Sequence, residues 1–373
     1  MERTEVKPDF FRRVFSSLGF SRTSQVDPPI DPPAPRVDPP AKRTRRQRAV
    51  SADWVAPEAV ASFDVSELRQ LVHNDLASAY RRARQSADPR AKVDREFMAR
   101  LARIVASETL ELPVFPKASR ELDQLLRDGD PDHQKVVDLL SREPDLLRRV
   151  WQRANCALYR VPVTDLDRAI SRLGYDEVWR IGMSACLQSE VFRAGPYAER
   201  VEAMRSMGLV AGRLAGWIEG SPRGEGYLAG LLHQVGGMYI LRIASLDRMH
   251  RPSDACIAAV LQRHQTAIAV IMCTVWGLGS NVSAGVGAFS RPVAAPLEAR
   301  PFVTSVRDGV LGAVVGRQIL NGTFSETHHR LLVTARTEQG DAEKIVKRSK
   351  RFWMAEQDGV GDPGGAETAR AAS

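Results

Sequence analysis

The hydrophobic positions of this chain keep a helical spacing from about residue 65 to about residue 320. After Asp64, a suitable N-cap, apolar residues recur every three or four positions. Pro89 then begins a second such stretch, which ends near Ser107. We expect these two helices to form an extension over residues 51–107. Beyond it helix follows helix with no alternating β pattern, so the sequence predicts an all-α protein.

One later helix has the clearest pattern. Between Ile257 and Val275 the apolar residues form a single stripe, and His264 lies on that stripe. An imidazole in such a position is more often a hydrogen-bonded core residue than a ligand. We therefore favour a structural role for His264 and keep a ligand role as the alternative.

A second histidine interrupts the apolar run of residues 229–238. If that run is one helix, the residues three and four positions from His233 share its face, and all of them are small: Ala229, Gly230, Gly236 and Gly237. This predicts a shallow groove that admits a metal, a ligand or a closely packed helix, with packing alone favoured. The next residue, Gln234, is neutral where a metal site would favour a carboxylate.

Residues 1–50 have a composition unlike the rest of the chain. Phe10, Phe11 and Phe15 belong to a short basic amphipathic segment, and a proline-rich stretch follows between residues 27 and 40. We expect this tail to be disordered. Docking of the amphipathic segment to a partner groove or to a membrane surface is the alternative.

The same tail carries a block of bases over residues 42–48, among them Arg43, Arg45 and Arg46. Such a block is able to neutralise phosphates of a nucleic acid or anionic lipid headgroups, although a solvated tether is the simpler interpretation. The chain has a net charge of +8, and residues 1–50 hold eleven Lys or Arg against six acids. Most of the excess charge therefore lies outside the expected folded domain.

The cysteine pattern and the apolar runs of the sequence indicate the cellular compartment of the protein. The four cysteines are scattered with no CxxC pair, which fits a reducing cytoplasm. The sequence shows neither a signal-peptide pattern nor an uninterrupted apolar run long enough for a membrane span.

After Thr323 the apolar pattern weakens, so we expect residues 323–373 to be weakly structured or disordered.

Five landmarks occur in a fixed order along the central part of the chain. They are Leu112–Pro116, Glu143–Leu146, Arg153–Tyr159, Ala169–Gly174 and Gly230–Gly236. Together they resemble the HDOD family, with a domain over residues 108–322. The resemblance implies a multi-helical bundle related to the HD-type metal-dependent phosphohydrolases, and bacterial signal transduction without hydrolysis in most members.

The resemblance also specifies what an active site would need: a histidine on an earlier helix, an adjacent His-Asp pair and a later aspartate. The earlier helix, over residues 201–218, has neither His nor Asp, and Gln234 replaces the aspartate of the pair. His264 matches the family's later histidine. We therefore expect no catalytic residue, no bound metal and no cofactor, and we expect protein partners in signalling.

The alternative is a residual phosphohydrolase or a sensor of a cyclic dinucleotide. The residues that would line its groove are His233, Gln234, His264 and Asn155. For Asn155 we favour hydrogen bonds to backbone groups between helices, because an unpaired buried amide costs about 1–3 kcal/mol.

Overall fold

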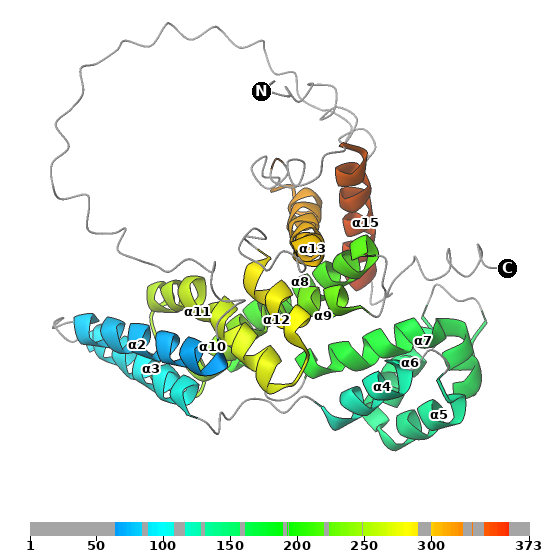
Figure 1. Cartoon of the computed structure of the whole chain (residues 1–373), viewed down its shortest axis with the longest axis horizontal. Helices are drawn as coiled ribbons and strands as arrows, with labels where there is room; N and C mark the ends of the chain where they lie inside the picture. Colours follow the sequence, from blue (N-terminus) through cyan, green and yellow to red (C-terminus); the bar gives the residue numbers. More distant parts are fainter. Residues whose placement is uncertain are drawn as a thin grey trace, which may run out of the picture. The chain divides into compact units, whose positions relative to one another are not determined.

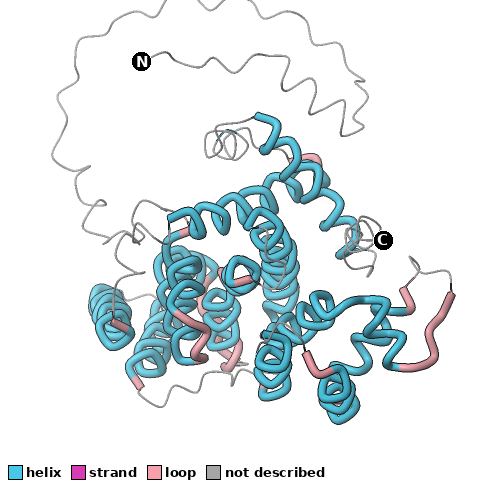
Figure 2. The backbone as a smooth tube through the Cα atoms, turned by 45° about the vertical axis from the view of Figure 1, so that its right-hand side comes forward, coloured by secondary structure: helices cyan, strands magenta, loops and turns pink. Residues whose placement is uncertain are grey.

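The computed structural model describes residues 64–83, 89–107, 116–127, 131–156, 161–188, 192, 194–219, 224–247, 249–289, 300–323, 330 and 339–357. Within these ranges the chain is helical with short connections and has no strand (Figure 2). The predicted all-α class is confirmed. The tail residues singled out above, Phe10, Phe11, Phe15, Arg43, Arg45 and Arg46, lie outside the described ranges.

The described helices are labelled along the chain in Figure 1. In chain order they are α2 (Val65–Ala83), α3 (Pro89–Ala106), α4 (Lys117–Arg127), α5 (His133–Arg142), α6 (Pro144–Ala154), α7 (Leu166–Ala185), η2 (Cys186–Gln188), η4 (Gly195–Tyr197), α8 (Ala198–Glu219), α9 (Glu225–Leu232), α10 (Val235–Ala244), α11 (Asp254–Val275), α12 (Ser280–Ala288), α13 (Arg300–Leu320) and α15 (Gln339–Gln357).

The helices α2 and α3 form an antiparallel hairpin. The Arg69 guanidinium at the start of α2 donates to the Ser107 carbonyl after α3, and Arg95 near the start of α3 donates to the Ala83 carbonyl at the end of α2. The hairpin contacts the rest of the fold, α2 against α11 and α3 against α10. The sequence left open how this extension is placed, and these contacts show that it packs on the main domain.

A second group consists of α4, α5, α6 and α7, which contact one another in turn. Asp132 caps α5 through the amide of Lys135, and Asp165 caps α7 through the amide of Arg168. Both residues have the extended backbone and the short side chain that favour an N-cap. Within α7 the helix changes direction at Gly174, whose φ of 74° is readily adopted only by glycine.

The remaining helices build the centre of the fold. Helix α8 packs against α9, α13 and α15, while α11 packs against α10 and α12. Glycines permit these close approaches. A Cβ on Gly212 would lie 2.8 Å from the Tyr227 carbonyl oxygen of α9, and a Cβ on Gly309 of α13 would lie 2.7 Å from the Ala215 amide of α8.

The C-terminal part of the chain corrects the sequence prediction for residues 323–373. Residues 339–357 form the helix α15, which packs on α13 and α8, and only residues 358–373 of that tail follow it outside the described ranges. The helix buries Ile345, Phe352 and Trp353, and the Trp353 indole donates to the Ala313 carbonyl. For residues 339–357 the prediction was wrong, because the charge balance of the segment was given more weight than its helical apolar spacing.

Helix α11 is both long and apolar. Its mean hydropathy and length are those of a helix that could cross a membrane, contrary to the sequence expectation, but 61% of its most apolar stretch is buried in the fold. The helix is therefore explained as a core element. Val275, which the sequence placed on the apolar stripe, is 48% exposed because the helix ends at this residue.

Candidate functional site

The sequence-predicted groove lies where α9 ends and α10 begins. His233 is the C-cap of α9 and Gln234 is the N-cap of α10, so residues 229–238 form two helices with a turn between them. The assumption of one continuous helix was wrong. The spacing rule that placed the glycines on both sides of His233 on one face therefore does not apply.

These glycines instead allow two different helices to approach. A Cβ on Gly230 would lie 2.8 Å from the Ala211 carbonyl oxygen of α8. A Cβ on Gly236 would collide with the Gln265 carbonyl of α11 and would lie 2.6 Å from the Ala269 amide. Backbone atoms cannot move aside as a flexible side chain can. The space beside these two glycines is thus filled by neighbouring helices.

The imidazole of His233 is buried, with 4% of its surface exposed. Its Nδ1 lies 2.6 Å from the Gly230 carbonyl oxygen, so Nδ1 carries the proton and donates it. The Phe289 ring packs edge-on against the imidazole, with 5.5 Å between ring centroids. Burial lowers the pKa of His233 to about 4, against a smaller upward effect of the Gly230 hydrogen bond. The ring is therefore neutral at pH 7.

The other ring nitrogen of His233, Nε2, has no hydrogen-bond partner among the described residues. A neutral imidazole with Nδ1–H on a carbonyl and a free Nε2 lone pair has the orientation of a metal ligand. The second ligand is missing, however, because Gln234 is an amide and cannot supply an anionic oxygen.

The resemblance implies a first metal ligand on the helix over residues 201–218, which is part of α8. Arg205 and Ser206 of this helix both contact a carboxylate of α15. Arg205 pairs with Glu202 in its own helix and with Glu356 of α15, at 3.3 Å. One residue earlier, Met204 lies against Gly237 of α10. This part of α8 therefore contributes an ion pair and a thioether to the packing of α15 and α10.

The residues present do not fit a divalent metal. Among the residues that the structure describes, no three His, Cys, Asp or Glu side chains come close enough to share an ion. Catalytic zinc sites use three protein ligands, and other transition-metal sites have a comparable requirement.

The second histidine singled out by sequence, His264, has a different environment. Its Nε2 lies 3.1 Å from Oδ2 of Asp75 in the α2–α3 hairpin, and the neighbouring Arg263 donates to Oδ1 of the same carboxylate. The hydrogen bond from His264 is the largest of the effects that lower the pKa of Asp75. His264 is a buried residue whose imidazole lies against a carboxylate at a contact between helices.

The sequence did not single out Asp75 or its counterpart Asp94. The Asp94 carboxylate of α3 accepts hydrogen bonds from the amide and hydroxyl of Ser253, at 2.7 Å each, where Ser253 caps α11. Two carboxylates of the hairpin therefore hold α11, one at its start and one near its middle. No local sequence pattern connects residues that lie 159 and 189 positions apart.

Asn155 has the backbone role that the sequence favoured. Its side-chain oxygen accepts from the Val163 amide at 2.7 Å, and its side-chain nitrogen donates to the Val163 carbonyl at 3.3 Å. Asn155 itself is exposed rather than buried. The structure thus distributes the four predicted groove residues over three places: His233 with Gln234, His264 with Asp75, and Asn155 with Val163.

A buried charge cluster also escaped the sequence analysis. Glu177 of α7 accepts from Arg153 of α6 at 2.9 Å and from Arg180 at 2.8 Å. Burial alone would raise the pKa of Glu177, but the arginines Arg153, Arg213 and Arg180 outweigh it and hold the pKa below its usual value. The Arg153 that opens one of the sequence landmarks is thus a partner in a buried ion pair.

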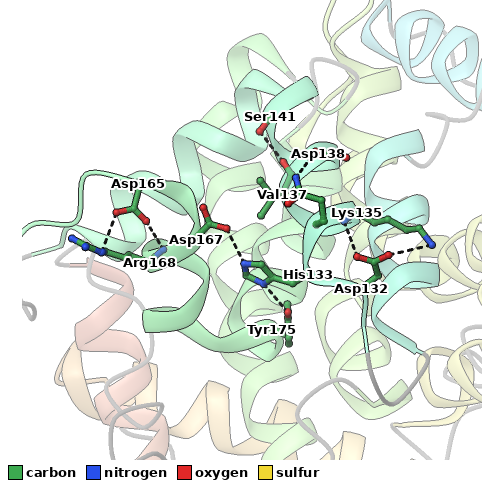
Figure 3. Close-up of polar contacts among 11 residues, drawn as sticks. Asp132, His133, Lys135, Val137, Asp138, Ser141, Asp165, Asp167, Arg168 and Tyr175 are labelled. Carbon is green, nitrogen blue, oxygen red and sulfur yellow. Dashed lines mark hydrogen bonds and ion pairs between the residues drawn. The ribbon is translucent and has the colours of Figure 1, made fainter.

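Polar groups also connect α5 and α7 (Figure 3). The His133 imidazole lies between the Tyr175 hydroxyl, 2.8 Å from Nδ1, and the Asp167 carboxylate, 3.0 Å from Nε2. Hydroxyl, imidazole and carboxylate in this order also occur in nucleophilic catalysis. A cavity of about 560 Å³ lies between α4 and α5, but the side chains that line it belong to the other face of α5 and exclude these three residues. We interpret the trio as a contact between helices.

Over the described residues the protein is all-helical, and His233 lies at the junction of α9 and α10. Residues 112–292 match the family model of the HDOD domain. The chain therefore carries an HDOD domain. None of the curated proteins searched matches the sequence.

Among solved structures, an HDOD domain protein of unknown function from Geobacter sulfurreducens is similar, with 19% identity, a TM-score of 0.48, and coverage of 72% of this chain and 93% of that one. Two proteins from Shewanella amazonensis are also similar. One is assigned to the metal-dependent phosphohydrolases, with 15% identity, a TM-score of 0.49, and coverage of 69% and 99%. The other is assigned to the phosphohydrolases, with 20% identity, a TM-score of 0.49, and coverage of 69% and 97%.

Proposed function

We propose that this protein is a non-enzymatic signal-transduction or scaffold protein of the cytoplasm, which acts through protein–protein contacts of its HDOD domain. The observation that carries the proposal is the state of His233. Its imidazole is neutral and buried, and the residues that would complete a metal site are the amide of Gln234 and the ion-paired Arg205. Even the loss of an outer-shell partner commonly lowers metal affinity about 10- to 100-fold, so a site without its ligands is expected to be ineffective.

The packing around the junction supports the same proposal. Gly230 and Gly236 bring the backbones of α8 and α11 against α9 and α10. A nucleotide substrate needs a cleft of several hundred Å³ in most proteins. Close backbone contact on both sides of His233 favours a rigid platform over a reaction chamber.

The test is a phosphoester cleavage assay on the full-length protein with manganese, iron or magnesium supplied. Substrates would be bis-p-nitrophenyl phosphate and the cyclic dinucleotides. We expect rates equal to those of buffer with metal alone, and equal rates for wild-type and His233→Ala protein. Metal-dependent turnover that disappears in His233→Ala would overturn the proposal.

A second candidate is a sensor of a cyclic dinucleotide, and one observation favours it: Nε2 of His233 has a lone pair and no partner among the described residues. A ligand N–H or O–H could donate to it. Calorimetric titration with cyclic dinucleotides decides between the two. Binding at micromolar concentration that His233→Leu abolishes would favour the sensor, and absence of heat in both proteins would exclude it.

A further inference from the structure

The outer face of α15 carries a dense row of bases. Five of the eight residues from 344 to 351 are Lys or Arg, and none of the eight is an acid. Lys344, Lys347 and Arg351 are exposed and follow one another at spacings of three and four, which places them on one side of the helix. We call Lys344, Lys347, Arg348, Lys350 and Arg351 the α15 basic stripe.

The opposite face of α15 is buried in the fold. The neighbouring helices bury Ile345, Phe352 and Trp353. Ser349 packs closely on Gly316 of α13, and a Cβ on Gly316 would collide with the Ser349 hydroxyl. The stripe is therefore fixed in orientation on a packed helix. It lies outside residues 112–292, so the family match does not account for it.

Three of the bases have local environments that bear on binding. Arg348 lies over the Trp217 ring, 4.7 Å from its centroid, and 5.7 Å from the centroid of Phe352. A guanidinium held against aromatic rings loses less conformational freedom when it binds an oxyanion. Lys347 and Arg351 are exposed and form no ion pair with a described residue. Their charges are available to an external anion.

We propose that the α15 basic stripe binds the phosphodiester backbone of a nucleic acid. Residues 344–351 rise about 10 Å along the helix axis at about 1.5 Å per residue. A strand of duplex DNA advances about 3.4 Å per phosphate along its axis. The stripe is thus long enough to face about three consecutive phosphates.

The chemistry of the stripe favours a nucleic acid over a membrane or a protein. An interfacial helix inserts an apolar face between lipids, and the apolar face of α15 is already buried. A protein partner usually needs an apolar or aromatic anchor pocket at the centre of the contact, and the exposed positions of the stripe are charged. Phosphate neutralisation requires bases alone.

The experiment is fluorescence anisotropy of the full-length protein with labelled duplex DNA, single-stranded DNA and RNA between 50 and 200 mM salt. The test variant is Lys347→Gln/Arg351→Gln. The matched control is Lys92→Gln/Lys117→Gln, which removes the same charge from the exposed side chains of α3 and α4. Unchanged thermal melts would establish that each variant is folded.

We expect wild-type protein to bind at least one of the three nucleic acids with a steep salt dependence. For the test variant we expect about tenfold weaker binding and a salt slope smaller by about 2, because each lost phosphate contact contributes about 0.9 to the slope. The control should bind like wild type. Equal affinity of the test variant and the control would overturn the proposal.

The basic tail is a separate source of affinity, so a third variant, Arg43→Gln/Arg45→Gln/Arg46→Gln, is needed. If the stripe changes also weaken binding when they are added to the tail variant, the result supports binding by the stripe. Binding that disappears with the tail changes and is unaffected by the stripe changes would overturn it. Retention on phosphatidylserine vesicles without binding to any nucleic acid would also overturn it.

Discussion

His233 and His264 are two imidazoles of one helical core, and their surroundings differ in a way that explains what each does. His233 contacts a backbone carbonyl and an aromatic edge, has no charged partner among the residues that the structure describes, and has a pKa that burial lowers to about 4. His264 is equally buried but pairs with the Asp75 carboxylate. The first imidazole has an unpartnered nitrogen at a helix junction, and the second connects α11 to the α2–α3 hairpin.

The difference shows that the role of a histidine depends more on the group that its imidazole contacts than on the position of the residue in an apolar helix. Both residues interrupt hydrophobic patterns in the sequence, and both were candidates for the same groove. In the structure one faces inward at a helix junction and the other faces an element that lies outside the family match. The following predictions test this contrast, from the largest expected effect to the smallest.

Gly236→Ala should cause the largest loss of stability. The added methyl group would meet backbone atoms of Gln265 and Ala269 in α11, which cannot rotate away, so we expect a loss of about 3 kcal/mol in the free energy of unfolding. The matched control is Gly237→Ala, whose methyl would face the flexible ends of Gln265 and Met204 and should cost less than about 1 kcal/mol. Urea titration measures both. Equal losses would show that the junction is not closed by backbone contact.

Acid should destabilise the His233 junction. Because the folded-state pKa is about 4 and the ordinary value is 6.5, the unfolded chain binds a proton between these values while the folded chain does not. Stability is therefore present above pH 6.5 and is lost as the pH falls toward 4, by up to about 1.4 kcal/mol per pH unit and about 3 kcal/mol in total. His233→Leu, which cannot titrate, should lose correspondingly less between pH 6.5 and 4 in urea titrations. Parallel pH profiles of the two proteins would contradict the buried neutral imidazole.

Asp75→Ala should loosen the hairpin without affecting the His233 junction. It removes the acceptor of buried His264 and the partner of Arg263, so we expect a loss of about 2 kcal/mol. Hydrogen exchange followed by mass spectrometry should show faster exchange in residues 64–106 and unchanged exchange in α9 and α10. Glu67→Ala, an exposed change in the same helix, is the control. Slow exchange of the hairpin in Asp75→Ala would show that the apolar contacts alone hold it.

Asn155→Ala should have the smallest effect of the four. It removes two hydrogen bonds to Val163 from an exposed side chain, and we expect a loss of about 1 kcal/mol. Binding of any cyclic dinucleotide should be the same as in wild type, because Asn155 does not lie with His233. A selective loss of ligand binding would place Asn155 in a functional site.

The fold class and most helix positions could be predicted because they depend on local spacing. The helix start at Val65, the break before Pro89 and the core helix containing His264 all follow from caps, prolines and apolar periodicity. The turn at His233–Gln234 could not be predicted in this way, since nothing in the local residues marks a break in so apolar a run. The charged helix α15 was missed because composition was preferred to periodicity.

The candidate site was predictable only as far as its residue types. The amide at Gln234 and the lack of His and Asp in residues 201–218 could be read from the sequence. The contacts of Arg205 with Glu356 and of His264 with Asp75 join residues 151 and 189 positions apart and form only through tertiary packing. No local pattern encodes such pairs.

The most direct test of the central claim is the metal content of full-length protein purified without chelator, measured by plasma mass spectrometry beside His233→Ala. The incomplete ligand set predicts far less than one equivalent of iron, manganese or zinc in both proteins, with unchanged thermal melts after metal is added. About one equivalent of metal in the wild type, lost in His233→Ala, would contradict the claim and restore the phosphohydrolase interpretation.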